Sequence, residues 1–237
     1  MAEIYRLYTE ADYEATTKVT GLNQSQEWDE TAHLAGISGD IKFTTAGSGS
    51  VYCWAPHNVP SNNYYQYSGY VNRASYEITQ DNALALLHYG TSSGGTFRTG
   101  IYMRRSSGVN VLSHRIQQDS GNVQAVDLTL PSETFQYNVI VKKSTNSSTA
   151  DAYQEVYING VLASIISNIT VFNVFDFARV QIGPYSVSSS NTGSIYIGKI
   201  RVTDTANPIG PIVSYRHRPR PAAIMKKRQR IKGYRCG

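Results

Sequence analysis

The chain has 237 residues, 41% of them hydrophobic, and a formal net charge of +5. This hydrophobic content is sufficient for a buried core and excludes a wholly disordered chain. No apolar run approaches the roughly 20 residues of a membrane span, and the acidic start lacks the basic and apolar regions of a signal peptide, so we expect synthesis in the cytosol and no membrane partner.

Residues 1–30 are expected to form an N-terminal arm, in which residues 11–19 (ADYEATTKV) are the best candidate for a short helix. The sequence that follows is typical of a β protein, with turns rich in Gly, Ser and Asn between short apolar segments. Several of these segments alternate apolar and polar residues, as a half-buried sheet requires. Twelve are predicted as strands: 41–45, 50–54, 75–79, 83–89, 99–104, 109–116, 123–130, 136–142, 154–158, 161–166, 178–182 and 194–203.

The clearest local signal is a hairpin at residues 154–165 (QEVYINGVLASI). Asn159 and Gly160 lie between two β-branched runs, and this pair suits a type I′ turn because both central residues need a positive φ. Parallel strands would need connecting helices, and the sequence offers almost none. We therefore predict an all-β fold, an antiparallel β-sandwich or jelly roll, over residues 31–207.

The order of the later segments resembles a known family. QYNVIVKK, VYINGVLAS, RVQIGPYS and GSIYIGKIRVTDTA, which lie between residues 136 and 206, are similar to the latter half of concanavalin A-like lectin and glucanase domains, including the laminin G-like branch. Residues 75–105 resemble the middle strands of that family. The resemblance implies a concanavalin A-like sandwich over about residues 30 to 205. It implies little about activity, because this fold hosts lectins, hydrolases and structural modules.

Catalysis is not predicted. Glucanases of that family place carboxylates on alternate residues of one strand, where one attacks the sugar and another protonates the leaving oxygen. In residues 26–33 (QEWDETAH), Glu27 and Asp29 match two of the positions, but Ala32 stands at the third. A solvated polar loop is therefore the preferred interpretation.

No metal or cofactor is predicted either. The acidic residues Asp151, Asp176 and Asp204 are too isolated to form a calcium site. Cys53 and Cys236 are expected to be separate free thiols. The histidines show no metal-like spacing and are expected to be surface or hydrogen-bonded residues: His33, His57, His88, His114 and His217.

A tyrosine-rich stretch, residues 61–70 (SNNYYQYSGY), is the candidate glycan or interface surface. Aromatic faces stack on sugar rings while Asn and Gln amides bind hydroxyls, but the same side chains serve protein interfaces. We favour interface or edge packing over glycan binding for its four tyrosines: Tyr64, Tyr65, Tyr67 and Tyr70.

The positive charge is concentrated at the C-terminus. Residues 1–214 contain 13 Lys or Arg against 17 Asp or Glu, a charge of −4. Residues 208–237 are expected to form an extended basic arm, since the prolines of RHRPRP exclude a helix interior there. The arm has nine cations and no acid: Arg216, Arg218, Arg220, Lys226, Lys227, Arg228, Arg230, Lys232 and Arg235.

Such an arm suits three uses: contact with nucleic-acid phosphates, contact with an acidic neighbouring subunit, or a solvated end. Contact with a neighbour is slightly favoured, because Ile224, Met225 and Ile231 offer hydrophobic anchors.

These features together resemble phage particle proteins. Our leading hypothesis is therefore a non-enzymatic virion structural protein, a capsid decoration, minor capsid or tail component, that binds copies of itself and other virion proteins through its arms. The alternative is a carbohydrate-binding module that recognises a host-surface glycan, and a glycan hydrolase ranks last.

Overall fold

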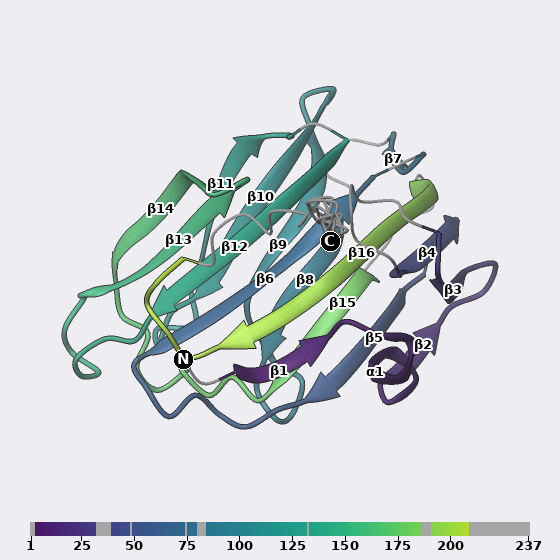
Figure 1. Cartoon of the computed structure of the whole chain (residues 1–237). Coiled ribbons are helices and arrows are strands. Elements are labelled where there is room, and N and C mark those ends of the chain that lie inside the picture. The colour runs from purple at the N-terminus through teal and green to yellow at the C-terminus, as the bar shows by residue number, and fades with distance from the viewer. Residues whose placement is uncertain are drawn as a thin grey trace, which may run out of the picture.

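Period-two alternation folds the chain into two antiparallel sheets that pack face to face (Figure 1). The computed structural model describes residues 3–31, 39–47, 49–73, 75–79, 84–131, 133–185 and 191–208. In strand β5 (Val51–Pro56), for example, Val51, Cys53 and Ala55 are buried between the sheets, whereas Tyr52 and Trp54 face outward.

The first sheet has nine strands among the described residues. The order along it is β14 (Val161–Ile169), β13 (Ala152–Ile158), β12 (Thr134–Lys142), β6 (Tyr64–Asn72), β16 (Asn191–Thr203), β4 (Asp40–Ala46) and β3 (Ser25–Asp29), and β1 (Glu3–Leu7) and β7 (Glu77–Ile78) also pair with β16.

The second sheet has seven strands in the same part of the chain. Their order is β11 (Val123–Thr129), β10 (Val109–Gln117), β9 (Phe97–Ser106), β8 (Leu84–Thr91), β15 (Arg179–Tyr185), β5 and β2 (Thr17–Thr20). A short helix, α1 (Glu10–Glu14), lies beside β1 and β2 at one end of the sandwich (Figure 1). No helix among the described residues is long and apolar enough to cross a membrane.

The core between the sheets is built around aromatic rings. Tyr65 of β6 stacks on Phe177 with ring centroids 4.1 Å apart and planes 7° apart, and both side chains are fully buried. Gly90 of β8 lies against this pair, where an added Cβ would be 2.8 Å from the Tyr65 ring. The rings therefore pack directly against the backbone of the opposite sheet.

Hydrogen bonds between buried polar groups also join the two sheets. His88 of β8 bonds to the Tyr137 hydroxyl of β12. His114 of β10 bonds to the Gln154 side chain and to the Ser164 hydroxyl, each at 2.9 Å. Because a buried polar group without a partner is costly, these bonds favour one alignment of the sheets over others.

The predicted sandwich is confirmed, and the hairpin at Asn159 and Gly160 is formed with φ values of 51° and 81°. Each of the twelve predicted segments overlaps an observed strand. The prediction missed β6, the central strand of the nine-stranded sheet, because its tyrosines were interpreted as surface.

The prediction of an N-terminal arm over residues 1–30 was wrong. The short helix is present as α1, but β1 pairs with β16, β2 with β5, and β3 with β4. Leu7 and Tyr13 are buried in the core. This segment therefore belongs to the sandwich, where β1 and β3 join the nine-stranded sheet and β2 joins the seven-stranded sheet. The expected C-terminal arm lies outside the described residues, apart from Pro208.

Acid should destabilise the fold through His88. Burial lowers the pKa of His88 to about 3, against about 6.5 in an unfolded chain. Between these pH values the unfolded state binds a proton that the folded state does not, so the free energy of unfolding falls as the pH decreases. For this one proton the loss is about 2 kcal/mol between pH 7 and pH 5.

Urea denaturation of the parent and of His88→Gln at pH 7 and pH 5 measures this effect. We expect the variant to lose less stability than the parent between the two pH values, whatever its stability at pH 7. Equal losses would show that His88 does not cause the pH dependence.

Candidate functional site

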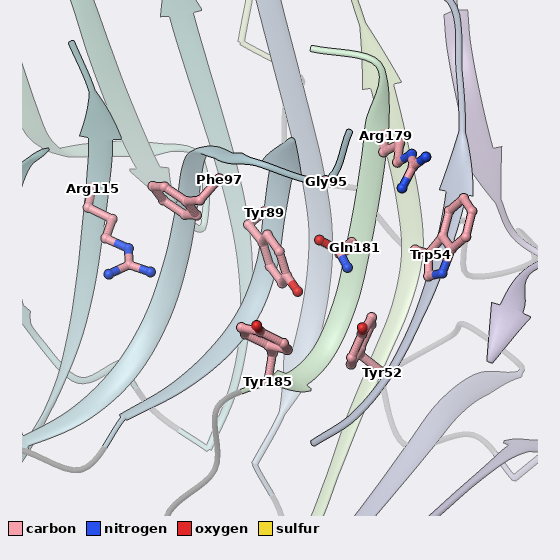
Figure 2. A pocket seen from close by; sticks show the side chains of 9 residues that line it. All are labelled: Tyr52, Trp54, Tyr89, Gly95, Phe97, Arg115, Arg179, Gln181 and Tyr185. Atoms are coloured by element: carbon pink, nitrogen blue, oxygen red, sulfur yellow. The ribbon is translucent and has the colours of Figure 1, made fainter. Parts of the chain in front are cut away.

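A groove lies on the outer face of the seven-stranded sheet (Figure 2). Its volume is about 340 Å³, within the range of small-molecule sites. Side chains from β5, β8, β9, β10 and β15 line it, because these strands direct alternate residues away from the core. The lining residues are Tyr52, Trp54, Tyr89, Gly95, Phe97, Arg115, Arg179, Gln181 and Tyr185.

The strand register places part of this lining in one row across the sheet. Arg115 pairs with Gly100, Gly100 with Tyr89, Tyr89 with Gln181, and Gln181 with Trp54. The row crosses four inter-strand steps of about 4.8 Å, so it spans about 19 Å. That length suits a chain molecule lying across the strands better than a single small ring.

The floor of the groove is a continuous set of aromatic contacts. The Tyr52 and Tyr185 rings are 5.3 Å apart in an edge-to-face arrangement. Tyr185 lies 5.8 Å from Tyr89, and Tyr89 lies 6.2 Å from Phe97. These contacts hold the rings in place, so the floor is formed before any ligand binds.

Arg115 lies beside Phe97 at one end of this floor, and Arg179 lies beside Trp54 on the other side of the groove (Figure 2). The Arg115 guanidinium is 4.2 Å from the centre of the Phe97 ring, and the Arg179 guanidinium is 4.5 Å from that of Trp54. Stacking on an aromatic face restricts the guanidinium plane. Both cations are therefore held beside the groove with N–H edges available to a ligand.

Tyr89 is the most buried side chain of the groove. It is 3% exposed, and its hydroxyl has no hydrogen-bond partner among the described residues. Burial is the main cause that raises its pKa, so the hydroxyl remains protonated near neutral pH and is able to donate. The Gln181 amide adds one acceptor and two donors beside it.

The prediction that Tyr65 and Tyr67 belong to a glycan or interface surface was wrong. Tyr65 and Tyr67 point into the core and are fully buried, because they occupy inward positions of β6, where the Tyr65 ring stacks on Phe177. Tyr64 and Tyr70 occupy outward positions of that strand and are only partly buried. Strand β6 belongs to the nine-stranded sheet, whereas the groove lies on the other sheet. The four tyrosines therefore do not form one surface, and none lines the groove.

The remaining polar candidates have structural roles. Glu27 pairs with Lys42 at 2.8 Å, and the preferred loop around it is in fact strand β3 for residues 25–29. The histidines were expected to be either surface or hydrogen-bonded residues, and His88 and His114 are buried and hydrogen-bonded. Within the described residues, no three His, Cys, Asp or Glu side chains gather as a metal site.

Cys53 is a free thiol buried in the core, where burial raises its pKa to about 12. The nine cations of the expected C-terminal arm, from Arg216 to Arg235, lie outside the described residues. Their role stays a prediction from the sequence.

Sequence reasoning missed the groove, although its signal was present. Tyr52 and Trp54 alternate with the buried residues of the predicted strand 50–54, and Arg179 and Gln181 do the same in 178–182. Which strands are neighbours was not predictable from these patterns. Without that information, the outward residues of separate strands could not be assembled into one site.

The chain is similar in structure to several solved proteins. No family model and no curated protein matches its sequence. The cellulose-induced protein Cip1 aligns with a TM-score of 0.59 and 12% identity over 87% of this chain and 100% of that one. An endo-β-1,4-glucuronan lyase from the fungus Trichoderma reesei aligns with a TM-score of 0.55 and 13% identity, over 80% of this chain and 90% of the lyase.

Botulinum neurotoxin type C also aligns, with a TM-score of 0.54 and 12% identity over 86% of this chain and 48% of that chain, so this chain spans about half of it. At these identities the likeness shows the β-sandwich fold and nothing finer.

A matched pair of variants checks the placement of β6. Tyr65→Ala should reduce the free energy of unfolding by about 3–5 kcal/mol, because it removes a fully buried ring and leaves a cavity. Tyr64→Ala should cost less than about 1 kcal/mol, because that side chain is only partly buried on the outer face. Denaturant unfolding of both variants measures this, and equal losses would contradict the assigned faces.

Proposed function

We propose that the protein is a carbohydrate-binding module and that the groove on the seven-stranded sheet is its binding site. The observation that carries this proposal is the preformed aromatic floor with hydrogen-bonding groups along it. Aromatic faces stack on the C–H faces of sugars. The half-buried Gln181 amide and the two arginines supply polar groups that sugar hydroxyls need.

The solved neighbours add support of a general kind. The names of two of them refer to polysaccharides, as a glucuronan lyase and as a protein induced by cellulose. A third is described as entering cells through two ganglioside molecules. The fold therefore occurs in proteins concerned with glycans, which favours a glycan ligand for this chain.

Binding without cleavage is part of the proposal. The groove is lined by aromatic residues, two arginines, a glutamine and a glycine, and none of these is a carboxylate or an imidazole. Glycoside hydrolysis commonly uses a pair of carboxyl groups on either side of the scissile bond. The lining lacks that pair.

Trp54 offers a direct test, because only two tryptophans occur in the chain and the other, Trp28, stacks near Tyr13 away from the groove. In a Trp28→Phe background, oligosaccharide titration should change the fluorescence of Trp54. Adding Tyr52→Ala should weaken binding at least about tenfold, as for a central aromatic contact. Tyr64→Ala, on the opposite sheet, is the matched control and should leave affinity unchanged.

Three outcomes would contradict this proposal. They are an unchanged Trp54 signal across neutral and acidic oligosaccharides, an equal loss of affinity in Tyr52→Ala and Tyr64→Ala, or fragmentation of a bound oligosaccharide detected by mass spectrometry. The last would replace a binding module with an enzyme.

A second candidate is the particle component inferred from the sequence, assembling from copies of itself. One observation favours self-association. Exposed apolar side chains gather on two edge strands, β11 and β14, which contact each other at one side of the sandwich. The residues are Val123, Val126, Val161, Leu162 and Ile165, with exposed fractions between 36% and 70%. Such patches often mark protein contacts.

Analytical ultracentrifugation tests this second candidate. The full chain should sediment as an oligomer, and the double variant Leu162→Lys with Ile165→Lys should sediment as a monomer. Leu22→Lys, at another exposed apolar residue, should not alter the parent oligomer. A parent chain that is monomeric at every concentration tested would remove the candidate.

A further inference from the structure

We propose that the groove selects an anionic glycan, with Arg115 and Arg179 each binding a carboxylate or sulfate group on a different sugar of one chain. This inference rests on the proposed carbohydrate-binding function and narrows its ligand class. It is carried by the charges of the groove and by the way the two guanidinium groups are held.

The two groove arginines have no internal counter-charge among the described residues. No acidic residue lines the groove. Among the described residues, neither Arg115 nor Arg179 forms a salt bridge, whereas Arg98 pairs with Asp176 and Arg104 with Asp127. The first 214 residues carry a charge of −4, so acids are available on this body. The two groove arginines are left for an external anion.

The environment of Arg115 also favours an anionic ligand. Its Nε is buried and has no hydrogen-bond partner among the described residues. Burial lowers the pKa of its guanidinium, which means that the surroundings disfavour the charge. A charged donor without an acceptor is costly in such a place. The two terminal nitrogens of the guanidinium are not among the buried, unpartnered atoms, so a ligand carboxylate or sulfate bound to them would supply the missing negative charge.

The orientation and separation of the two guanidinium groups favour an anionic chain as well. Stacking on Phe97 and on Trp54 orients each guanidinium before binding, and a fixed planar fork suits two-point binding of a carboxylate or sulfate. From β10 to β15 there are three inter-strand steps, and Arg179 lies two residues along β15 from the Arg115 row, which separates the two Cα atoms by about 16 Å. Two acidic groups that far apart belong to different sugars.

A nucleic-acid strand is the main rival, because aromatic and cationic grooves also bind single strands. A nucleic-acid strand carries a phosphate at every nucleotide, so several would fall along the roughly 19 Å row. Two separated arginines beside an uncharged aromatic floor match a chain with widely spaced acidic groups better.

The experiment uses the full chain with Trp28→Phe, so that Trp54 reports binding in the groove. This matters because the nine cations of residues 215–237 would also attract polyanions, whereas Trp54 lines the groove itself. The probes are a hexamer of β-1,4-linked glucuronate, a sulfated hexasaccharide, the neutral cellohexaose and a single-stranded DNA hexamer, all at physiological salt.

We expect an acidic oligosaccharide to bind at least about tenfold more tightly than cellohexaose. Arg115→Gln and Arg179→Gln should each remove about tenfold or more of that affinity, as expected for hydrogen bonds between charged groups. They should change cellohexaose binding less than about threefold. Arg6→Gln, which removes a charge on β1 far from the groove, is the matched control and should change nothing.

The outcomes separate the two proposals. Tighter binding of the glucuronate or of the sulfated hexasaccharide names the acidic group, and either result supports the inference. Equal or weaker binding of both acids than of cellohexaose overturns it while leaving carbohydrate binding intact. DNA binding as tight as that of the acidic sugars, or equal losses in Arg6→Gln, also overturns it. No Trp54 response to any oligosaccharide overturns both.

Discussion

Ring packing between the sheets is the constraint on which the rest of this molecule depends. The Tyr65 and Phe177 rings stack at 4.1 Å, and Gly90 allows them to lie against the backbone of β8. A sandwich of this kind must direct alternate residues of every inner strand into the core. The outward residues of the same strands are then released from packing, and the groove is made of them. The core and the groove therefore arise from the same alternation of inward and outward residues along each strand.

Two sets of buried polar groups, one between the sheets and one at the groove, differ in their hydrogen bonding. His88, His114 and Gln154 lie between the sheets and have partners there. They fix the alignment of the sheets, at the cost of acid sensitivity for the histidines. Tyr89 and the Nε of Arg115 lie on the outer face and lack partners among the described residues. Other buried side chains in the described part of the chain also have unpartnered atoms, Gln24 and Asn138 among them, but Tyr89 and Arg115 line a groove of aromatic and cationic side chains, where a ligand is able to bind.

Sequence patterns predicted the fold well and the site poorly, for one physical reason. Alternation within a strand is a local property. The predicted strands 50–54 and 178–182 and the turn at Asn159 were therefore all recognisable, and they overlap β5, β15 and the β13–β14 hairpin. The mistaken surface assignment of Tyr65 shows the limit. A tyrosine in an amphipathic strand suits either face, and only the opposing Phe177 decides which one. The groove requires the order of five strands, and that order is a non-local property.

The unsatisfied groups of the groove also connect function with stability. A buried hydroxyl and a buried guanidinium nitrogen without partners each reduce the free energy of unfolding, and replacing them with apolar groups would remove that cost. Their presence is understandable if a ligand completes them. Such a ligand stabilises the folded state by RT ln(1 + [L]/Kd), since the unfolded chain cannot assemble a row that depends on five strands. The destabilising features of the free protein are then the same ones that give the bound state its specificity.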